Sequence, residues 1–193
     1  PQCPLTAHRL AQLLASVGMP GEMLSVLHCP PEVAQRMVED DRMKVLSFTG
    51  SDSVGWKLKS LAGKKQVLLE LGGNAPCLID ETVEPSAVID RLLAGAWAHA
   101  GQVCIKVQRV LVHESRYHEL LTELVARTAE VRCGDPLDPA TVVGPLIDRS
   151  QVERVESWIE EAVSGGATLH CGGTSDGNVV APTILTDVEP GMK

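Results

Sequence analysis

Residues 66–79, which read QVLLELGGNAPCLI, decide the expected fold. Two apolar runs, 66–70 and 76–79, have the length and composition of buried strands. Gly72 and Gly73 separate them, and two glycines allow the backbone to change direction. We therefore expect two strands here, and we place an internal domain boundary at the glycine pair, with residues 1–71 before it and residues 72–193 after it.

On both sides of this stretch, helical and strand patterns alternate. Helices are predicted from apolar residues at helical spacing, and strands from short apolar runs. Before the boundary we expect helix 4–17, strand 23–27, helix 31–38, strand 44–48 and a helix N-capped by Ser51 that ends near Leu61. After it we expect helix 84–99, strand 107–112, a helix capped by Ser115, a helix that begins at Asp148 or Ser150, and strands 167–170 and 179–185. This alternation predicts an α/β fold with a mainly parallel sheet.

The composition excludes several functional classes. Hydrophobic residues make up 44% of the chain and the net charge is −8, which fits a folded domain that would repel nucleic acid and anionic lipid. The six cysteines are scattered without zinc spacing, and the six histidines form no metal pattern. With no signal peptide or long apolar run, we expect a cytoplasmic protein with free thiols that binds neither membrane nor metal. The first residue, Pro1, and the last, Lys193, look like cut ends, so we expect an internal fragment.

One segment could bind a phosphate. In residues 48–55, FTGSDSVG, a strand runs into a Gly-Ser turn and a helix follows. The free N–H groups of a helix's first turn, together with the helix dipole, form an anion site. Gly50 would let the backbone approach a pyrophosphate, and the Ser51 hydroxyl would add a donor. The alternative is an ordinary capped turn, because the motif is not one of the established phosphate-binding loops.

Two further residues could carry covalent chemistry. Glu70 closes an apolar strand, where burial would raise its pKa and suit it to act as a base; the alternative is a strand-end carboxylate in solvent. Cys104 follows a helix and a Gly-Gln break, and activation of its thiol would make it a nucleophile. The other five cysteines are interpreted as small buried hydrophobic residues.

Taken together, the segments SFTGS-x-x-VG, LELGGNAP and GQ-x-C-x-x-x-QR resemble the aldehyde dehydrogenase superfamily in order and spacing. The later VGPLI, residues 143–147, and PLTA, residues 4–7, fit the same family, so the resemblance covers essentially the whole chain. It implies that residues 1–71 are the C-terminal part of a Rossmann-like cofactor-binding domain. Residues 72–193 would be the N-terminal part of an α/β catalytic domain.

The resemblance also implies roles for single residues. Gly50 and Ser51 would hold the pyrophosphate of NAD or NADP, Val54 would line the adenine pocket, and Leu71 and Gly72 would approach the nicotinamide. The catalytic residues would be Cys104 and Glu70. Cys104 would attack an aldehyde to give a thiohemiacetal and then a thioester, and Glu70 would activate the water that releases a carboxylic acid.

The resemblance leaves some points open. The substrate would be a small aldehyde of unknown identity, and the parent protein would be a homo-oligomer. Pro1 occupies the position at which NAD-preferring members of the family often have an acidic residue. The absence of that residue leaves NADP possible. Because family residues for the oxyanion and the cofactor riboses lie outside the chain, the segment alone should be inactive or nearly so. Alternatives are an acylating or acyl-phosphate-type dehydrogenase of the same fold, a non-enzymatic relative, and a Cys–His hydrolase using His99.

Overall fold

The computed structural model describes residues 3–193, so Pro1 and the cofactor preference tied to it lie outside the described residues. The chain divides into two compact units, the first ending at Leu71 and the second running from Gly72 to Lys193. Their roles as cofactor-binding and catalytic parts stay predictions.

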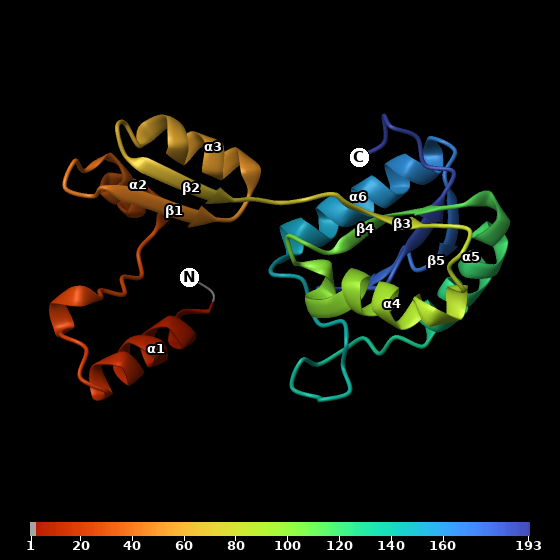
Figure 1. Cartoon of the computed structure of the whole chain (residues 1–193), viewed down its shortest axis with the longest axis horizontal. Helices are drawn as coiled ribbons and strands as arrows, with labels where there is room; N and C mark the ends of the chain where they lie inside the picture. The colour runs from red at the N-terminus through yellow and green to blue at the C-terminus, as the bar shows by residue number, and fades with distance from the viewer. Residues whose placement is uncertain (1–2) are drawn as a thin grey trace. The chain divides into compact units, whose positions relative to one another are not determined.

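The first unit is built on one pair of parallel strands. Its elements are α1 (Pro4–Ser16), η1 (Gly21–Met23), α2 (Pro31–Glu39), β1 (Val45–Thr49), α3 (Asp52–Leu61) and β2 (Gln66–Glu70). β1 and β2 pair in parallel with Thr49 opposite Glu70, and α3, which connects them, lies against the pair (Figure 1). This is a βαβ unit, in which a helix crosses over between parallel strands.

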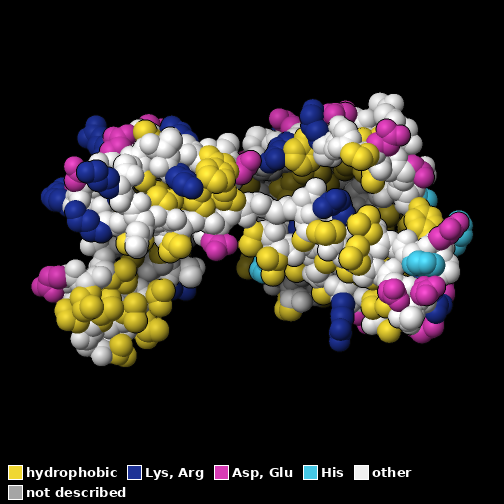
Figure 2. Space-filling model, turned by 45° about the horizontal axis from the view of Figure 1, so that its top comes forward, with side chains coloured by type: hydrophobic (Ala, Val, Ile, Leu, Met, Phe, Trp, Pro, Cys, Tyr) yellow, Lys and Arg dark blue, Asp and Glu magenta, His cyan; other side chains and the backbone are white. Residues whose placement is uncertain are grey.

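Little apolar surface is buried in this unit. Val38 and Ala62 are its buried hydrophobic side chains among the described residues. No residue of α1 is buried, although its apolar residues recur at helical spacing. Figure 2 shows hydrophobic side chains gathered on its surface; those exposed there include Leu5, Leu10, Leu13 and Val17.

The strand expected at 23–27 is absent from the described structure. Gly21–Met23 form a 3-10 turn, and the residues that follow have no regular structure. Leu24 has extended dihedral angles, but no strand pairs with this segment. An apolar run forms a strand only when a neighbouring strand pairs with its N–H and C=O groups. Because no described strand pairs with residues 23–27, the predicted strand does not form, and the sequence prediction was wrong.

The second unit contains the larger core. It opens with β3 (Ala75–Ile79), η2 (Pro85–Ala87), α4 (Ile89–Trp97), η3 (Ala98–Gly101), β4 (Val107–Val112) and α5 (Glu114–Ala129). β3 and β4 pair in parallel, again with helical segments between them. The core cluster of buried residues comprises Ile79, Ile89, Leu92 and Leu120. This core joins one strand to the two helices α4 and α5.

The rest of the second unit is antiparallel. Its elements are α6 (Arg149–Ser164), β5 (Thr168–Cys171), β6 (Ser175–Asp176), β7 (Val179–Val180) and β8 (Ile184–Thr186). β5 pairs with β8 and β6 with β7, both antiparallel. The expectation of mainly parallel pairing therefore holds for β1–β2, for β3–β4 and for an isolated bridge between Cys133 and Val143, but not for these two strand pairs. The expected strand 179–185 is interrupted by Pro182, which has no N–H for a ladder.

Two helix boundaries also differ from the sequence expectation. The helix expected over 84–99 is shorter, because Pro85 keeps Glu84 extended and Ala98 leaves helical geometry. The N-cap of α5 is His113, whose ring accepts from the Ser115 N–H, whereas Ser115 was expected to be the cap. No described helix is long and apolar enough to cross a membrane.

Candidate active site

The predicted phosphate-binding turn lies at the carboxyl end of β1. The Gly50 N–H donates to the Glu70 carbonyl at 3.0 Å and so extends the strand pairing beyond Thr49. A Cβ on Gly50 would lie 2.6 Å from the Phe48 ring, so a side chain there would have to displace that ring. The turn between β1 and α3 is therefore held to the end of β2, where a ligand would meet the carboxyl ends of parallel strands.

Ser51 is the N-cap residue of α3, as predicted, but it makes no capping hydrogen bond. Its hydroxyl lies 3.5 Å from the Ser53 hydroxyl and is exposed. The first-turn N–H groups of α3 are therefore not capped by this side chain and can face an anion. Asp52, also in the first turn, places a negative charge beside them and would weaken anion binding.

The remaining predicted residues of the first unit lie near this turn. Leu71 packs over α3, since a Cβ on Gly55 would lie 2.5 Å from its Cδ2 atom. Val54 is exposed on the same helix. The structure thus brings Gly50, Ser51, Val54, Glu70 and Leu71 to one end of the β1–β2 pair.

Glu70 is the last residue of β2 and is exposed. No hydrogen bond or ion pair involves its carboxylate among the residues that the structure describes. Of the two interpretations of this side chain, the structure therefore shows the strand-end carboxylate in solvent and not the buried one. A free carboxylate at a strand end can still accept a proton from a water molecule.

Cys104 lies in an unusual turn of the second unit. Before it, His99, Ala100 and Gly101 all have left-handed dihedral angles, with φ of 52°, 55° and 68°. After it, the Lys106 N–H donates to the Val103 carbonyl at 3.1 Å and closes a tight turn that leads into β4. Cys104 is exposed on this turn. A small molecule can reach a thiol in this position, and the thiol can attack it.

The segment that contains Gly73 and Asn74 restricts the turn on one side. A Cβ on Gly73 would lie 2.6 Å from the Cys104 carbonyl oxygen, so only glycine fits there without movement. The Arg109 guanidinium donates to the Asn74 carbonyl at 3.1 Å. These contacts join the LGGN segment to the cysteine segment, two motifs that are separate in the sequence.

The Gln102 side chain makes a third connection that sequence reasoning missed. Its Oε1 accepts from the Ile147 N–H at 3.0 Å, and its Nε2 faces the carbonyls of His99 at 3.3 Å and Pro145 at 3.4 Å. The sequence contained both GQ and VGPLI, but nothing in it indicated that they touch.

Lys106 is half-buried, and burial lowers its pKa. Its side chain passes close to Gly101, where a Cβ would lie 3.6 Å from Nζ. This places the amine beside the left-handed segment.

Other cysteines and histidines offer no competing centre. Cys3 and Cys133 are exposed, so the expectation of buried cysteines was wrong for these two; Cys29, Cys77 and Cys171 are half-buried, and Cys77 packs against the core cluster. The described residues contain no hydrogen bond between His99 and Cys104, as a Cys–His pair would need. Residues 3–193 also contain no metal-binding group of three or more His, Cys, Asp or Glu side chains.

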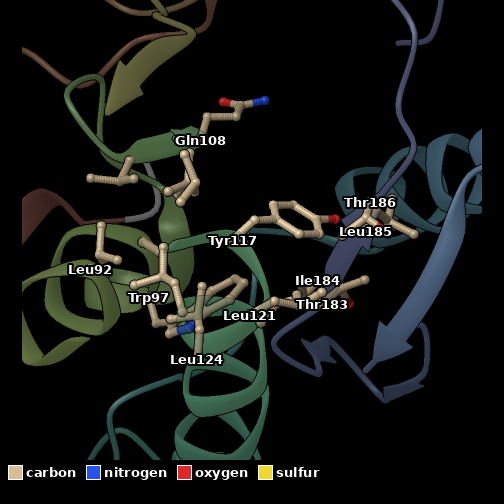
Figure 3. A pocket seen from close by; sticks show the side chains of 15 residues that line it. Leu92, Trp97, Gln108, Tyr117, Leu121, Leu124, Thr183, Ile184, Leu185 and Thr186 are labelled. Carbon is tan, nitrogen blue, oxygen red and sulfur yellow. The ribbon is translucent and has the colours of Figure 1, made fainter. Parts of the chain in front are cut away.

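A pocket of about 170 Å³ lies elsewhere in the second unit (Figure 3). Side chains of α4, β4, α5 and β8 surround it, with Trp97 and Leu124 on one side and Tyr117 pointing toward Thr186. None of the predicted site residues lines it. Its lining is mostly apolar and contains no cysteine or carboxylate, so it is not the predicted reaction site.

Comparison with known proteins decides the family. A sequence profile described as "Aldehyde dehydrogenase family" matches residues 1–193. The chain belongs to the aldehyde dehydrogenase family. The resemblance carried by the three motifs is thereby confirmed.

Individual relatives agree with the family assignment. The chain is 37% identical over 191 residues to the 3-sulfolactaldehyde dehydrogenase of Priestia megaterium, covering 98% of the chain and 40% of that protein. It is 35% identical over 198 residues to the betaine aldehyde dehydrogenase of Brucella anthropi, covering 98% of the chain and 41% of that enzyme. The chain thus spans about two-fifths of the length of the relatives it matches.

Solved structures confirm the α/β fold. Aldehyde dehydrogenase 21 of Physcomitrella patens, in complex with the reaction product succinate, matches with a TM-score of 0.94 and 39% identity over 98% of this chain and 40% of its own. An aldehyde dehydrogenase of Mycobacterium tuberculosis complexed with NAD+ matches with a TM-score of 0.93 and 35% identity over 98% of this chain and 41% of its own. The chain therefore has the aldehyde dehydrogenase fold.

Proposed function

We propose that this chain supplies the nucleophile and the water-activating carboxylate of an enzyme that oxidises an aldehyde to a carboxylic acid with NAD+ or NADP+. The observation that carries the proposal is the exposed thiol of Cys104 on a turn fixed by Gly73. Glu70 precedes Gly73 by only three residues, so the chain itself keeps their Cα atoms within roughly 11 Å. Connectivity alone therefore limits how far Glu70 can lie from the thiol.

The reaction follows from these two groups. The Cys104 thiolate forms a C–S bond to the aldehyde carbon, and the carbonyl electron pair moves onto oxygen. A nicotinamide held beside Leu71 and Gly72 would supply the hydride acceptor, so that loss of hydride from the Cys104 adduct would leave a thioester on Cys104. Glu70 takes a proton from water, the resulting hydroxide attacks the thioester carbon, and the C–S bond breaks to return the thiolate and release the acid.

The first unit fits the dinucleotide in our proposal. Gly50 and Ser51 would hold the pyrophosphate at the uncapped first turn of α3, and Val54 would contact the adenine. Leu71 and Gly72 would approach the nicotinamide. The solved relatives support both cofactors, since one aldehyde dehydrogenase is complexed with NAD+ and the glyceraldehyde-3-phosphate dehydrogenase of Bacillus halodurans is complexed with NADP.

We further propose that the 193-residue chain alone turns over slowly or not at all, because it spans only about two-fifths of the relatives. The catalytic test therefore uses the natural gene product that contains this sequence. With an aldehyde and NAD+ or NADP+, Glu70→Gln should lose about 10²–10⁴-fold in rate and accumulate an acyl group on Cys104. Peptide mass spectrometry detects that adduct.

Two further variants complete the test. With Glu70 intact, Cys104→Ser should form no NAD(P)H, whereas Cys133→Ser, a change at another exposed thiol, should still form it. In the Glu70→Gln background, Cys104→Ser should abolish the adduct and Cys133→Ser should keep it. An active Cys104→Ser variant would overturn the proposal. The second candidate, transfer of the acyl group to coenzyme A, is disfavoured by the presence of Glu70; product that appears only with added coenzyme A would favour it.

A further inference from the structure

The Gln102 amide contacts a segment of the second unit that backbone hydrogen bonds hold in place. In the segment Val143–Ile147, Val143 and Leu146 are buried. The Val143 N–H donates to the Arg132 carbonyl at 3.1 Å, its carbonyl accepts from Gly134 at 3.0 Å, and the Leu146 N–H donates to Asn178 at 2.7 Å. Backbone hydrogen bonds thus hold this segment to two other parts of the chain before Gln102 contacts it.

The turn that carries Cys104 has few attachments of its own. It begins after the left-handed residues His99 and Ala100, a conformation that L-residues seldom adopt without support from their surroundings. Its internal hydrogen bond joins Val103 to Lys106 and does not tie it to another element. Gly73 limits its movement on one side only.

The contacts of Gln102 match the chemistry of an amide. Its oxygen meets an N–H group and its nitrogen meets two carbonyls, so each end of the amide faces groups of the right kind. One of these carbonyls belongs to His99, within the left-handed segment, and the other to Pro145. A single side chain therefore joins the segment before the thiol to the exposed residues Pro145 and Ile147, which flank the buried Leu146.

We propose that Gln102 is a positioning residue, which holds the turn of Cys104 at one place by clamping it to Val143–Ile147. The inference rests on the proposed function only in treating Cys104 as the nucleophile. Gln102 does not touch the reacting atoms and acts through the backbone between His99 and Cys104.

Two substitutions separate the parts of the clamp. Gln102→Met keeps the length of the side chain and removes both ends of the amide. Gln102→Glu keeps an acceptor for the Ile147 N–H but places oxygen against the carbonyls of His99 and Pro145. The matched control is Gln151→Met, because Gln151 makes comparable side-chain contacts with Ser150 and Arg154 in α6.

Hydrogen exchange measured by NMR on the 193-residue chain tests the clamp directly, because it follows the Ile147 amide that donates to Gln102. In Gln102→Met we expect the Ile147 amide to exchange at least tenfold faster, and the Cys104 amide resonance to broaden as its turn samples several conformations. Gln102→Glu should keep the Ile147 protection but broaden Cys104, and Gln151→Met should change neither. Unchanged Ile147 exchange in Gln102→Met would overturn the clamp.

Alkylation by iodoacetamide then distinguishes positioning from a merely structural role. Across a pH series, the rate at Cys104 in Gln102→Met should change at least threefold, while Cys133 and Cys171 of the same molecule keep their rates. If the Ile147 amide loses protection and Cys104 reacts as before, the amide does not position the thiol and the proposal is wrong. Neither measurement needs turnover, so the proposed function can fail independently.

Discussion

At the scale of single residues, Gly73 shows how a missing β-carbon can set the place of a reactive group. The space that a side chain would fill is taken by the Cys104 carbonyl, which is backbone and cannot swing away. A larger residue must therefore push the cysteine turn or move its own segment. Close approach of two backbone segments is a common physical reason for a glycine.

We predict that Gly73→Ala lowers the free energy of unfolding by about 1–3 kcal/mol, because the added methyl group overpacks a backbone contact. Urea denaturation measures the change. Gly144→Ala is the matched control in the same unit: its Cβ would lie 3.6 Å from Pro136, an ordinary contact, so we expect a change within about 0.5 kcal/mol. Equal stability of Gly73→Ala and the unsubstituted protein would contradict the contact.

The sequence allowed Cys104 and Glu70 to be proposed because each lies in a recognisable local motif. It did not allow the role of Gln102 to be predicted, because its partners Pro145 and Ile147 are brought to it only by folding. It left the exposure of Glu70 open, since the alternation along a strand does not tell which face another element will cover.

At the scale of elements, local signals predicted helices and strands well where a single residue type decides the boundary. Asp148 was one of two expected starts of α6, and it is the N-cap there. The start of α5 was missed because His113 is an uncommon cap, whereas Ser115 is a common one. The end of α4 was missed because the left-handed residues after Ala98 include His99 and Ala100, whose side chains give no such signal.

The Asp148 cap gives a pH-dependent prediction. Hydrogen bonds from the Ser150 hydroxyl and the Gln151 N–H hold the pKa of this carboxyl below its usual value. A group whose pKa is lower in the folded state stabilises the fold above its unfolded pKa, and this contribution disappears as the pH falls through the folded pKa. Asp148→Asn should therefore lower the unfolding free energy at neutral pH.

The difference in unfolding free energy between Asp148→Asn and the unsubstituted protein should become smaller below about pH 4, where carboxyl groups take up protons. Denaturation curves at a series of pH values measure it. Asp176→Asn, at an exposed position in β6, serves as the control and should show no such trend. A difference that stays constant down to acid pH would show that the charge of Asp148 contributes nothing.

At the scale of the whole molecule, the two units differ in how much apolar surface they bury. The first unit buries Val38 and Ala62 among the described residues, whereas the second has a core cluster and further buried residues such as Val152 and Leu146. Since apolar burial supplies most of the stability of a fold, the units should differ in stability. The alternation of helices and strands predicted the α/β class but not this imbalance.

We predict that the first unit opens before the second. In hydrogen exchange with mass spectrometry at increasing urea, peptides from residues 3–71 should lose protection at lower urea than peptides from residues 72–193. The two groups of peptides come from the same sample and serve as each other's control. Loss of protection at one common urea concentration would mean that the chain unfolds as a single cooperative unit.

The left-handed residues before Gln102 also make the direction of its side chain depend on the number of residues between Trp97 and Gln102. Successive residues in this conformation advance around an axis by about 100° each, as in a helix of opposite hand. One residue inserted or deleted between Trp97 and Gln102 would turn the amide away from Ile147, however conservative the new side chain. In this short stretch the number of residues should therefore matter more than their identity.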